Sequence, residues 1–210
     1  MSVPGGVTRS MRAQSAGEAA AVARARRAQP NGWWGMVLFL CAEVTIFGTL
    51  LATYFYLDFD ARRWPPPGVP RPELLDPLVA TGFLVATSIP MFAAARAAVA
   101  GSRRPTVAMI ALALVVQSGY FAFQVSLFRH DLAQFSPKAS AYGSIYFTLL
   151  GAHHAHVLFG ILLGGAVLWH VARHGLTNYW LIGVRGLALY WHVVNALAVL
   201  VVLTQVSPSL

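Results

Sequence analysis

Five long stretches of nearly uninterrupted apolar residues divide this chain, and short segments rich in arginine, proline and acidic residues separate them. None of the stretches alternates apolar and polar residues as strands of a membrane barrel do. Each has about the 20 residues that a helix needs to cross a bilayer. The pattern therefore predicts an all-α integral membrane bundle of five transmembrane helices, since helices pair every backbone group within the span. The predicted helices cover residues 33–57, 78–100, 105–128, 139–170 and 187–206.

The segments outside these helices predict the domain organisation. Residues 1–32 are rich in Ala, Arg, Ser and Gly and contain no apolar run, so we expect a disordered basic cytoplasmic arm rather than a secretory signal. One transmembrane domain, 33–210, follows. The connection from Asp58 to Asp76 holds five prolines and four acidic residues and should be an extended loop, with Asp76 capping the second helix. Pro90 predicts a kink in that helix.

Composition and charge narrow the class of protein. With 57% hydrophobic and 10% charged residues among 210, the chain is not an ordinary soluble domain. The net charge of +8 could suggest nucleic acid, but the basic residues lack the aromatic interleaving of such modules, so we expect no nucleic-acid partner. Ten basic residues lie in the segments on the N-terminal side of the membrane and five in the others. This bias predicts an inner N-terminus and an outer C-terminus.

Glu43 is the only acidic residue within the five apolar stretches. It lies ten residues after Trp33, which is roughly 15 Å along a helix and near the middle of the hydrocarbon layer. An ionised carboxylate costs at least ~3 kcal/mol at that depth. Two roles remain open. Glu43 is either a neutral carboxyl that hydrogen-bonds between helices or a carboxylate that binds and releases protons.

Histidines are the other polar residues that could carry chemistry. His153 and His156 are three positions apart and share a helix face, whereas His154 points elsewhere. His192 and Asn195 repeat this spacing in the last helix. Such histidines can bind a metal ion or a haem, but the apolar stretches offer only one carboxylate and one cysteine to complete a ligand set. We therefore expect histidines that join helices or contact lipid headgroups, with no catalytic residue and no metal site.

Three stretches, taken together, resemble subunit III of haem–copper terminal oxidases. The first apolar stretch resembles the first core helix of that family, with Glu43 at the position of its buried glutamate. The penultimate helix of the family carries the pattern Gly-x-His-x-x-His-Val-x-x-Gly. The matching positions here are Gly151, His153, His156, Val157 and Gly160. The last helix of the family commonly reads Tyr-Trp-His-Phe-Val-Asp. The matching positions are Tyr190, Trp191, His192 and Val194.

The chain departs from the family pattern in three places. Asn195 stands where the family usually has Asp, and Leu127 stands where many relatives have Glu. Two N-terminal helices of larger members have no counterpart here. In those members a cleft between that pair and the remaining helices holds lipid, so the resemblance implies lipid against the corresponding face of this chain. The candidates for lipid contact are Trp33, Trp34, His153, His156, Tyr190 and Trp191.

The resemblance implies a non-catalytic accessory subunit of a respiratory oxidase. The complete enzyme would reduce dioxygen to water and pump protons, with haem and copper held by partner subunits and none in this chain. The implied partners are catalytic subunit I, subunit II, small subunits and phospholipid. Arginine outnumbers lysine fourteen to one, which favours a bacterial plasma membrane over the mitochondrial inner membrane. The alternatives are subunit III of a quinol oxidase, an accessory protein of nitric-oxide reductase, and a small transporter that uses Glu43 to bind protons.

Overall fold

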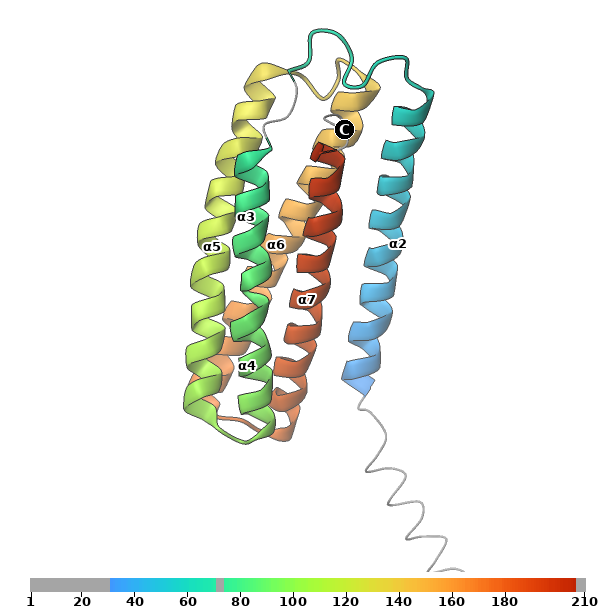
Figure 1. The fold of residues 1–210 in the computed structure, drawn as a ribbon. Helices are drawn as coiled ribbons and strands as arrows, with labels where there is room; N and C mark the ends of the chain where they lie inside the picture. The colour runs from blue at the N-terminus through green and yellow to red at the C-terminus, as the bar shows by residue number, and fades with distance from the viewer. Residues whose placement is uncertain (1–30, 71–73, 207–210) are drawn as a thin grey trace, which may run out of the picture.

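The structure is a computed structural model that describes residues 31–70 and 74–206. Throughout these residues the regular elements are helices, and five helical segments are long and apolar enough to cross a membrane (Figure 1). The prediction of an all-α bundle of five spans is confirmed. The predicted basic arm lies outside the described residues except for its last two positions. The helices are α2 (Asn31–Asp60), α3 (Leu75–Ala86), α4 (Ser88–Val99), α5 (Arg103–Gln134), α6 (Ala141–His174) and α7 (Asn178–Val206).

Several helices extend beyond the predicted apolar stretches. Helix α7 begins at Asn178, nine residues before the predicted start at 187, and α5 continues to Gln134 rather than ending at 128. Helices of 29 to 34 residues are roughly 45–50 Å long at 1.5 Å per residue, whereas the hydrocarbon layer is about 30 Å thick. Charged residues therefore end the apolar run at the membrane boundary without ending the helix.

The second span consists of two helices, α3 and α4, separated at Thr87. Pro90 has no amide hydrogen to donate to the carbonyl of Ala86, so the α-helical ladder cannot continue through this turn. The Thr87 amide is shared between the Phe83 oxygen, four residues back at 3.3 Å, and the Leu84 oxygen, three residues back at 3.0 Å. The predicted kink is thus an interruption three residues before the proline. The prediction that Asp76 caps this span is wrong, because Leu74 is the N-cap residue and Asp76 already lies in the first turn of α3.

Helix α7 lies at the centre of the bundle and α2 lies at its edge. Helix α7 contacts α2, α3, α4 and α6, whereas among the described helices α2 contacts only α6 and α7 (Figure 1). Of the most apolar 18 residues of α7, 61% are buried within the chain, whereas the corresponding share for α2 is 11%. Helix α2 therefore leaves most of its apolar surface for lipid or for another protein.

Glycines on α6 allow this helix to approach its neighbours, as their four-residue spacing indicates. A Cβ atom at Gly160 would lie 3.2 Å from Cε1 of Tyr190 on α7. One at Gly164 would lie 2.9 Å from Cδ2 of Leu114 on α5. Helix α6 is therefore packed closely against both α5 and α7.

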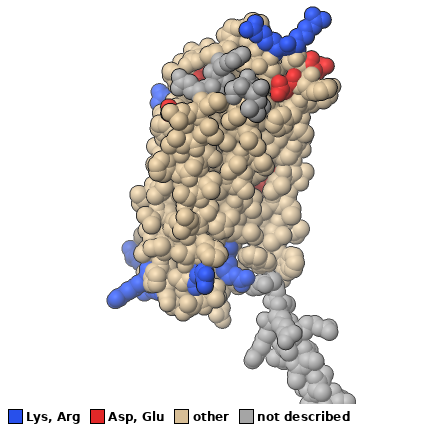
Figure 2. Space-filling model, viewed as in Figure 1, with Lys and Arg blue, Asp and Glu red and all other residues tan. Residues whose placement is uncertain are grey.

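Charged side chains lie at the two ends of the bundle, with an almost uncharged band between them (Figure 2). At the end with the α4–α5 and α6–α7 connections the described basic residues are Arg96, Arg103, Arg104, Arg173 and Arg185. The opposite end carries both signs: Asp58, Asp60, Asp76 and Asp131 with Arg62, Arg63, Arg129 and Lys138. This distribution fits a membrane protein. The inner location of the N-terminus remains a prediction, because it depends on the five arginines of the N-terminal arm.

The start of α6 should tolerate no side chain at Gly143. A Cβ atom there would lie 2.7 Å from the backbone oxygen of Ser136, so the backbone must shift. We expect Gly143→Ala to destabilise the folded chain by about 1–3 kcal/mol, the usual cost of overpacking. Gly151→Ala is the matched control on the same helix, where an added Cβ meets nothing within 4 Å. Thermal unfolding in mild detergent measures both, and an equally stable Gly143→Ala variant would show that this contact is not constraining.

Candidate functional site

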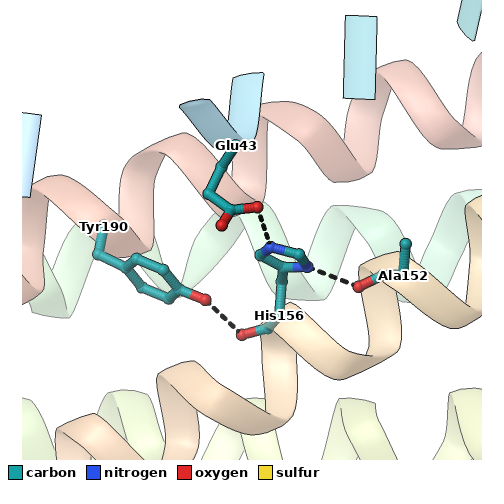
Figure 3. Close-up of polar contacts among 4 residues, drawn as sticks. All are labelled: Glu43, Ala152, His156 and Tyr190. Atoms are coloured by element: carbon teal, nitrogen blue, oxygen red, sulfur yellow. Dashed lines mark hydrogen bonds and ion pairs between the residues drawn. The ribbon is translucent and has the colours of Figure 1, made fainter. Parts of the chain in front are cut away.

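Glu43 and His156 form a contact between α2 and α6. Oε2 of Glu43 lies 2.6 Å from Nε2 of His156, and the side chains are 15% and 20% exposed (Figure 3). Glu43 is twelve residues from the start of α2, roughly 18 Å along the helix, so the contact lies near the middle of the span. The lone carboxyl of the apolar stretches therefore has a partner on another helix, and that partner was not predicted.

The backbone of α6 determines which nitrogen of His156 carries a hydrogen. Nδ1 lies 2.7 Å from the carbonyl oxygen of Ala152, which can only accept, so Nδ1 donates (Figure 3). Nε2 then has two options. It accepts a hydrogen bond from protonated Glu43, or it donates as part of an imidazolium to the ionised carboxylate. Either arrangement places one proton between the residues and gives the pair no net charge, which suits a site at hydrocarbon depth.

Two aromatic residues hold this pair in place. The Tyr190 hydroxyl on α7 donates to the backbone oxygen of His156 at 2.8 Å, so α2, α6 and α7 meet here (Figure 3). The fully buried ring of Phe47 packs edge-on against the imidazole, with ring centres 5.1 Å apart. An open pocket of about 210 Å³ adjoins the imidazole and is lined by Phe39, Ala155, His156, Phe159 and Tyr190.

His153 is directed toward α5 rather than toward α2. It is 2% exposed, and its Nε2 lies 3.3 Å from the Tyr120 hydroxyl, which accepts a hydrogen bond from Nε2 of Gln124 at 2.9 Å. The tyrosine hydroxyl keeps its own hydrogen, which it can donate to Nε2 of His153. Residues three apart differ by about 60° around a helix. Here that difference directs His153 toward α5 and His156 toward α2. The shared face expected for His153 and His156 is thus divided between α5 and α2.

The remaining histidines do not join the Glu43 contact. His154 is 9% exposed and packs edge-on against the rings of Phe121 and Phe128. His192 is partly exposed on α7 and belongs to neither of the hydrogen-bonded groups described above. Throughout 31–70 and 74–206, no three His, Cys, Asp or Glu residues lie close enough together to hold a metal ion.

The predicted lipid contacts differ in their exposure. Trp34 is 55% exposed, and Trp33 is partly exposed beneath the guanidinium of Arg185, 5.1 Å from its ring centre. Tyr190 and Trp191 are each 1% exposed, so both pack within the bundle. Among the two histidines, only His156 reaches an open pocket, and the burial of His153 leaves it in contact with protein.

Asn195 and Trp191 join α7 to the interruption between α3 and α4. Nδ2 of Asn195 donates to the Leu84 oxygen at 3.0 Å and to the Ser88 hydroxyl at 2.9 Å. Nε1 of Trp191 donates to the Thr87 hydroxyl at 2.8 Å. The position at which the family usually has Asp therefore supplies a donor here. This donor adds to the Thr87 amide and hydroxyl, which also donate to the Leu84 carbonyl at the interrupted turn.

Sequence reasoning missed three polar residues that complete these contacts. Thr87, Tyr120 and Gln124 lie inside apolar stretches, and none of them was among the predicted site residues. Two signals could have indicated them. Thr87 precedes Pro90 by three residues, where a helix loses a backbone bond, and Tyr120 and Gln124 are four apart on one helix face.

A comparison with known protein families shows to which family the chain belongs. Residues 17–206 match the family described as cytochrome c oxidase subunit III. The chain belongs to this family. Both helices that supply the Glu43–His156 contact fall within the matched region. So does α7, whose Tyr190 hydroxyl donates to the backbone oxygen of His156.

Relatives occur among both bacterial and animal proteins. The chain is 32% identical over 174 residues to cytochrome c oxidase subunit 3 of Synechocystis, covering 77% of this chain and 69% of that protein. It is 28% identical to cytochrome bo(3) ubiquinol oxidase subunit 3 of Pseudomonas putida, covering 77% of this chain and 76% of the relative. It is also 28% identical to cytochrome c oxidase subunit 3 of Coturnix japonica. That match covers 77% of this chain and 64%, or slightly under two thirds, of the relative.

Proposed function

We propose that this chain is a non-catalytic accessory subunit of a haem–copper terminal oxidase. In this role it stabilises catalytic subunit I, contacts subunit II and small subunits, and holds structural phospholipid. The whole complex reduces dioxygen to water and pumps protons, with haem and copper in the partner subunits. The observation that carries the proposal is the family match over residues 17–206.

The polar groups within the membrane span support a bracing role. Glu43 and His156 join α2 to α6, Tyr190 joins α7 to α6, and Asn195 joins α7 to the α3–α4 interruption. Each of these groups is engaged in holding one helix to another. Helix α2, which the chain covers on one side only, provides an apolar surface for a neighbouring subunit or for lipid.

The electron donor admits a second candidate. The similarity to a subunit of a bo(3) ubiquinol oxidase, over 76% of that relative, favours a quinol-oxidising complex as the alternative to one that oxidises cytochrome c. The accessory role proposed for this chain is the same in both. Turnover of the purified complex with each donor distinguishes them. We place the complex in a bacterial plasma membrane.

Purification of the chain from its native membrane tests this proposal. An affinity tag on the chain should isolate, in mild detergent, a complex with haem absorbance bands and with the larger oxidase subunits in equal amounts. An untagged membrane preparation is the control for non-specific retention. Recovery of the chain by itself, without haem and with proton-coupled transport after reconstitution, would overturn the proposal in favour of a small transporter.

A further inference from the structure

A basic pocket opens at the end of the bundle that holds the α4–α5 connection (Figure 1). It has a volume of about 780 Å³ and is lined by the first residues of α5 and by Ala172, near the end of α6. Arg103 and Arg104 are its charged lining residues, and Val107 and Ala108 belong to its apolar part. The pocket therefore offers two positive charges beside an apolar surface.

The two arginines of this pocket differ in their partners. The guanidinium of Arg103 donates through Nε to the backbone oxygen of Val171 at 3.0 Å, and through a second nitrogen to that of Ala172. These oxygens belong to the last turns of α6, where carbonyl groups carry partial negative charge, so Arg103 stabilises the end of that helix. Arg104 is exposed and has no hydrogen-bond, ion-pair or ring partner among the described residues. Its guanidinium is therefore available to an anion.

The described carboxylates lie away from this pocket. One is within the span and four are at the opposite end of the bundle: Glu43, Asp58, Asp60, Asp76 and Asp131 (Figure 2). Two further acidic residues fall outside the described ranges. Glu73 directly precedes Leu74, at the opposite end, and the segment 1–30 that contains Glu18 also carries five arginines. The charge around the pocket is therefore positive.

An exposed apolar face of α5 continues from Arg104 into the membrane span. Ala108, Leu112 and Val115 follow Arg104 by four, eight and eleven residues, so the four residues share one face of the helix. Leu112 is 49% exposed and Val115 is 71% exposed, and in a membrane such residues contact acyl chains. A cationic group followed by an apolar face matches the order of groups in a phospholipid, with the phosphate first and an acyl chain next.

We propose that this pocket binds an anionic phospholipid of the phosphatidylglycerol class. The guanidinium of Arg104 would donate two hydrogen bonds to the phosphate, and Arg103 would add its charge, while one acyl chain lies along Ala108, Leu112 and Val115. The volume of the pocket falls within the range of about 300–1,000 Å³ that is usual for sites of small ligands. This inference rests on the proposed lipid-holding function and assigns it a location and a headgroup class.

The arrangement disfavours the other obvious occupants. A zwitterionic phospholipid would bring its own ammonium group close to two guanidinium groups, which is unfavourable. A free phosphate ion would use the arginines but would leave the apolar face of α5 without a partner. An anionic phospholipid satisfies both the charge of the pocket and the apolar face beside it.

Lipid retention by the purified complex tests the charged and the apolar half of this site. Arg104→Gln removes the free charge, and Ala108→Phe fills the apolar part of the pocket at an exposed position. The controls are Arg96→Gln, an exposed arginine of the same end that does not line the pocket, and Ala52→Phe, an exposed alanine on α2. Each complex is delipidated, exposed to phosphatidylglycerol, and analysed by native mass spectrometry. We expect both site variants to bind one lipid fewer, with at least tenfold weaker binding, and the controls to match the unchanged complex.

Chemical modification of the unchanged complex keeps the proposal falsifiable if a variant fails to assemble. Phenylglyoxal modifies accessible guanidinium groups, and peptide mass spectrometry measures its rate at each arginine. Phosphatidylglycerol should slow the modification of Arg104 at least tenfold relative to phosphatidylcholine, and the rate at Arg96 should stay nearly unchanged.

Three results would overturn the proposal: full lipid retention in both site variants, equal protection of Arg104 by phosphatidylcholine or by inorganic phosphate, and equal protection of Arg96. A partner subunit that fills the pocket would also overturn it. The total number of lipids held by the unchanged complex reports on the proposed lipid-holding function, whereas the difference between site and control variants reports on this pocket. Haem bands in the same preparation report separately on the proposed oxidase function.

Discussion

Glu43→Leu is expected to lower the yield and the thermal stability of the assembled complex. The substitution leaves Nε2 of His156 without a partner near the middle of the membrane, and an unsatisfied buried group costs about 1–3 kcal/mol. Glu43→Gln should remain close to the unchanged protein. Its amide donates to Nε2, while Nδ1 of His156 keeps its bond to Ala152. The difference between the two variants is measured as the unfolding temperature of the solubilised complex and as the amount of each subunit that the complex retains.

A double variant and a turnover assay separate the structural role of Glu43 from proton handling. Glu43→Leu with His156→Leu removes both polar partners at once, and it should recover part of the stability that the single change loses. The Gln variant cannot titrate, so a structural role predicts nearly normal turnover and an unshifted pH profile. If that variant assembles fully yet turns over poorly, Glu43 handles protons and our preference for bracing is wrong.

Asn195→Leu should produce the second large loss of stability. It removes the hydrogen bonds from Nδ2 to the Leu84 carbonyl and to the Ser88 hydroxyl at the point where the second span is interrupted. Each hydrogen bond lost lowers the stability by about 0.5–1.5 kcal/mol. Asn195→Asp should lose less, because a neutral carboxyl can donate to the Leu84 carbonyl and accept from the Ser88 hydroxyl.

The matched control for Asn195 is Ala196→Leu, at a neighbouring exposed position on α7. This change should leave the unfolding temperature of the complex nearly unchanged. An Asn195→Leu variant as stable as the control would show that the contacts with the interrupted turn do not hold α7 in place.

The number of spans could be predicted from the sequence because the length of each apolar run is set by bilayer thickness. The helix ends could not be predicted, because a helix can continue past the point where its residues stop being apolar. Helix α7 shows this clearly. It begins at Asn178 and passes Arg185 before reaching the apolar run from which it was predicted.

The members of the site could be predicted, but their pairing could not. Glu43 and His156 stood out as polar residues in apolar stretches, yet they are 113 residues apart and meet only because α2 packs against α6. No local pattern in one sequence determines which helices become neighbours. The same limit explains why the burial of Tyr190 and Trp191 was not predicted. Both were candidates for lipid contact, and the central position of α7 buries them instead.

The central claim is that this chain braces an oxidase whose redox groups belong to its partners. The most direct test is to strip the chain from the purified complex and measure haem and copper per catalytic subunit. The account predicts unchanged haem absorbance and copper content, with lower stability of the remaining subunits. A loss of haem or copper in proportion to the chain removed would contradict it.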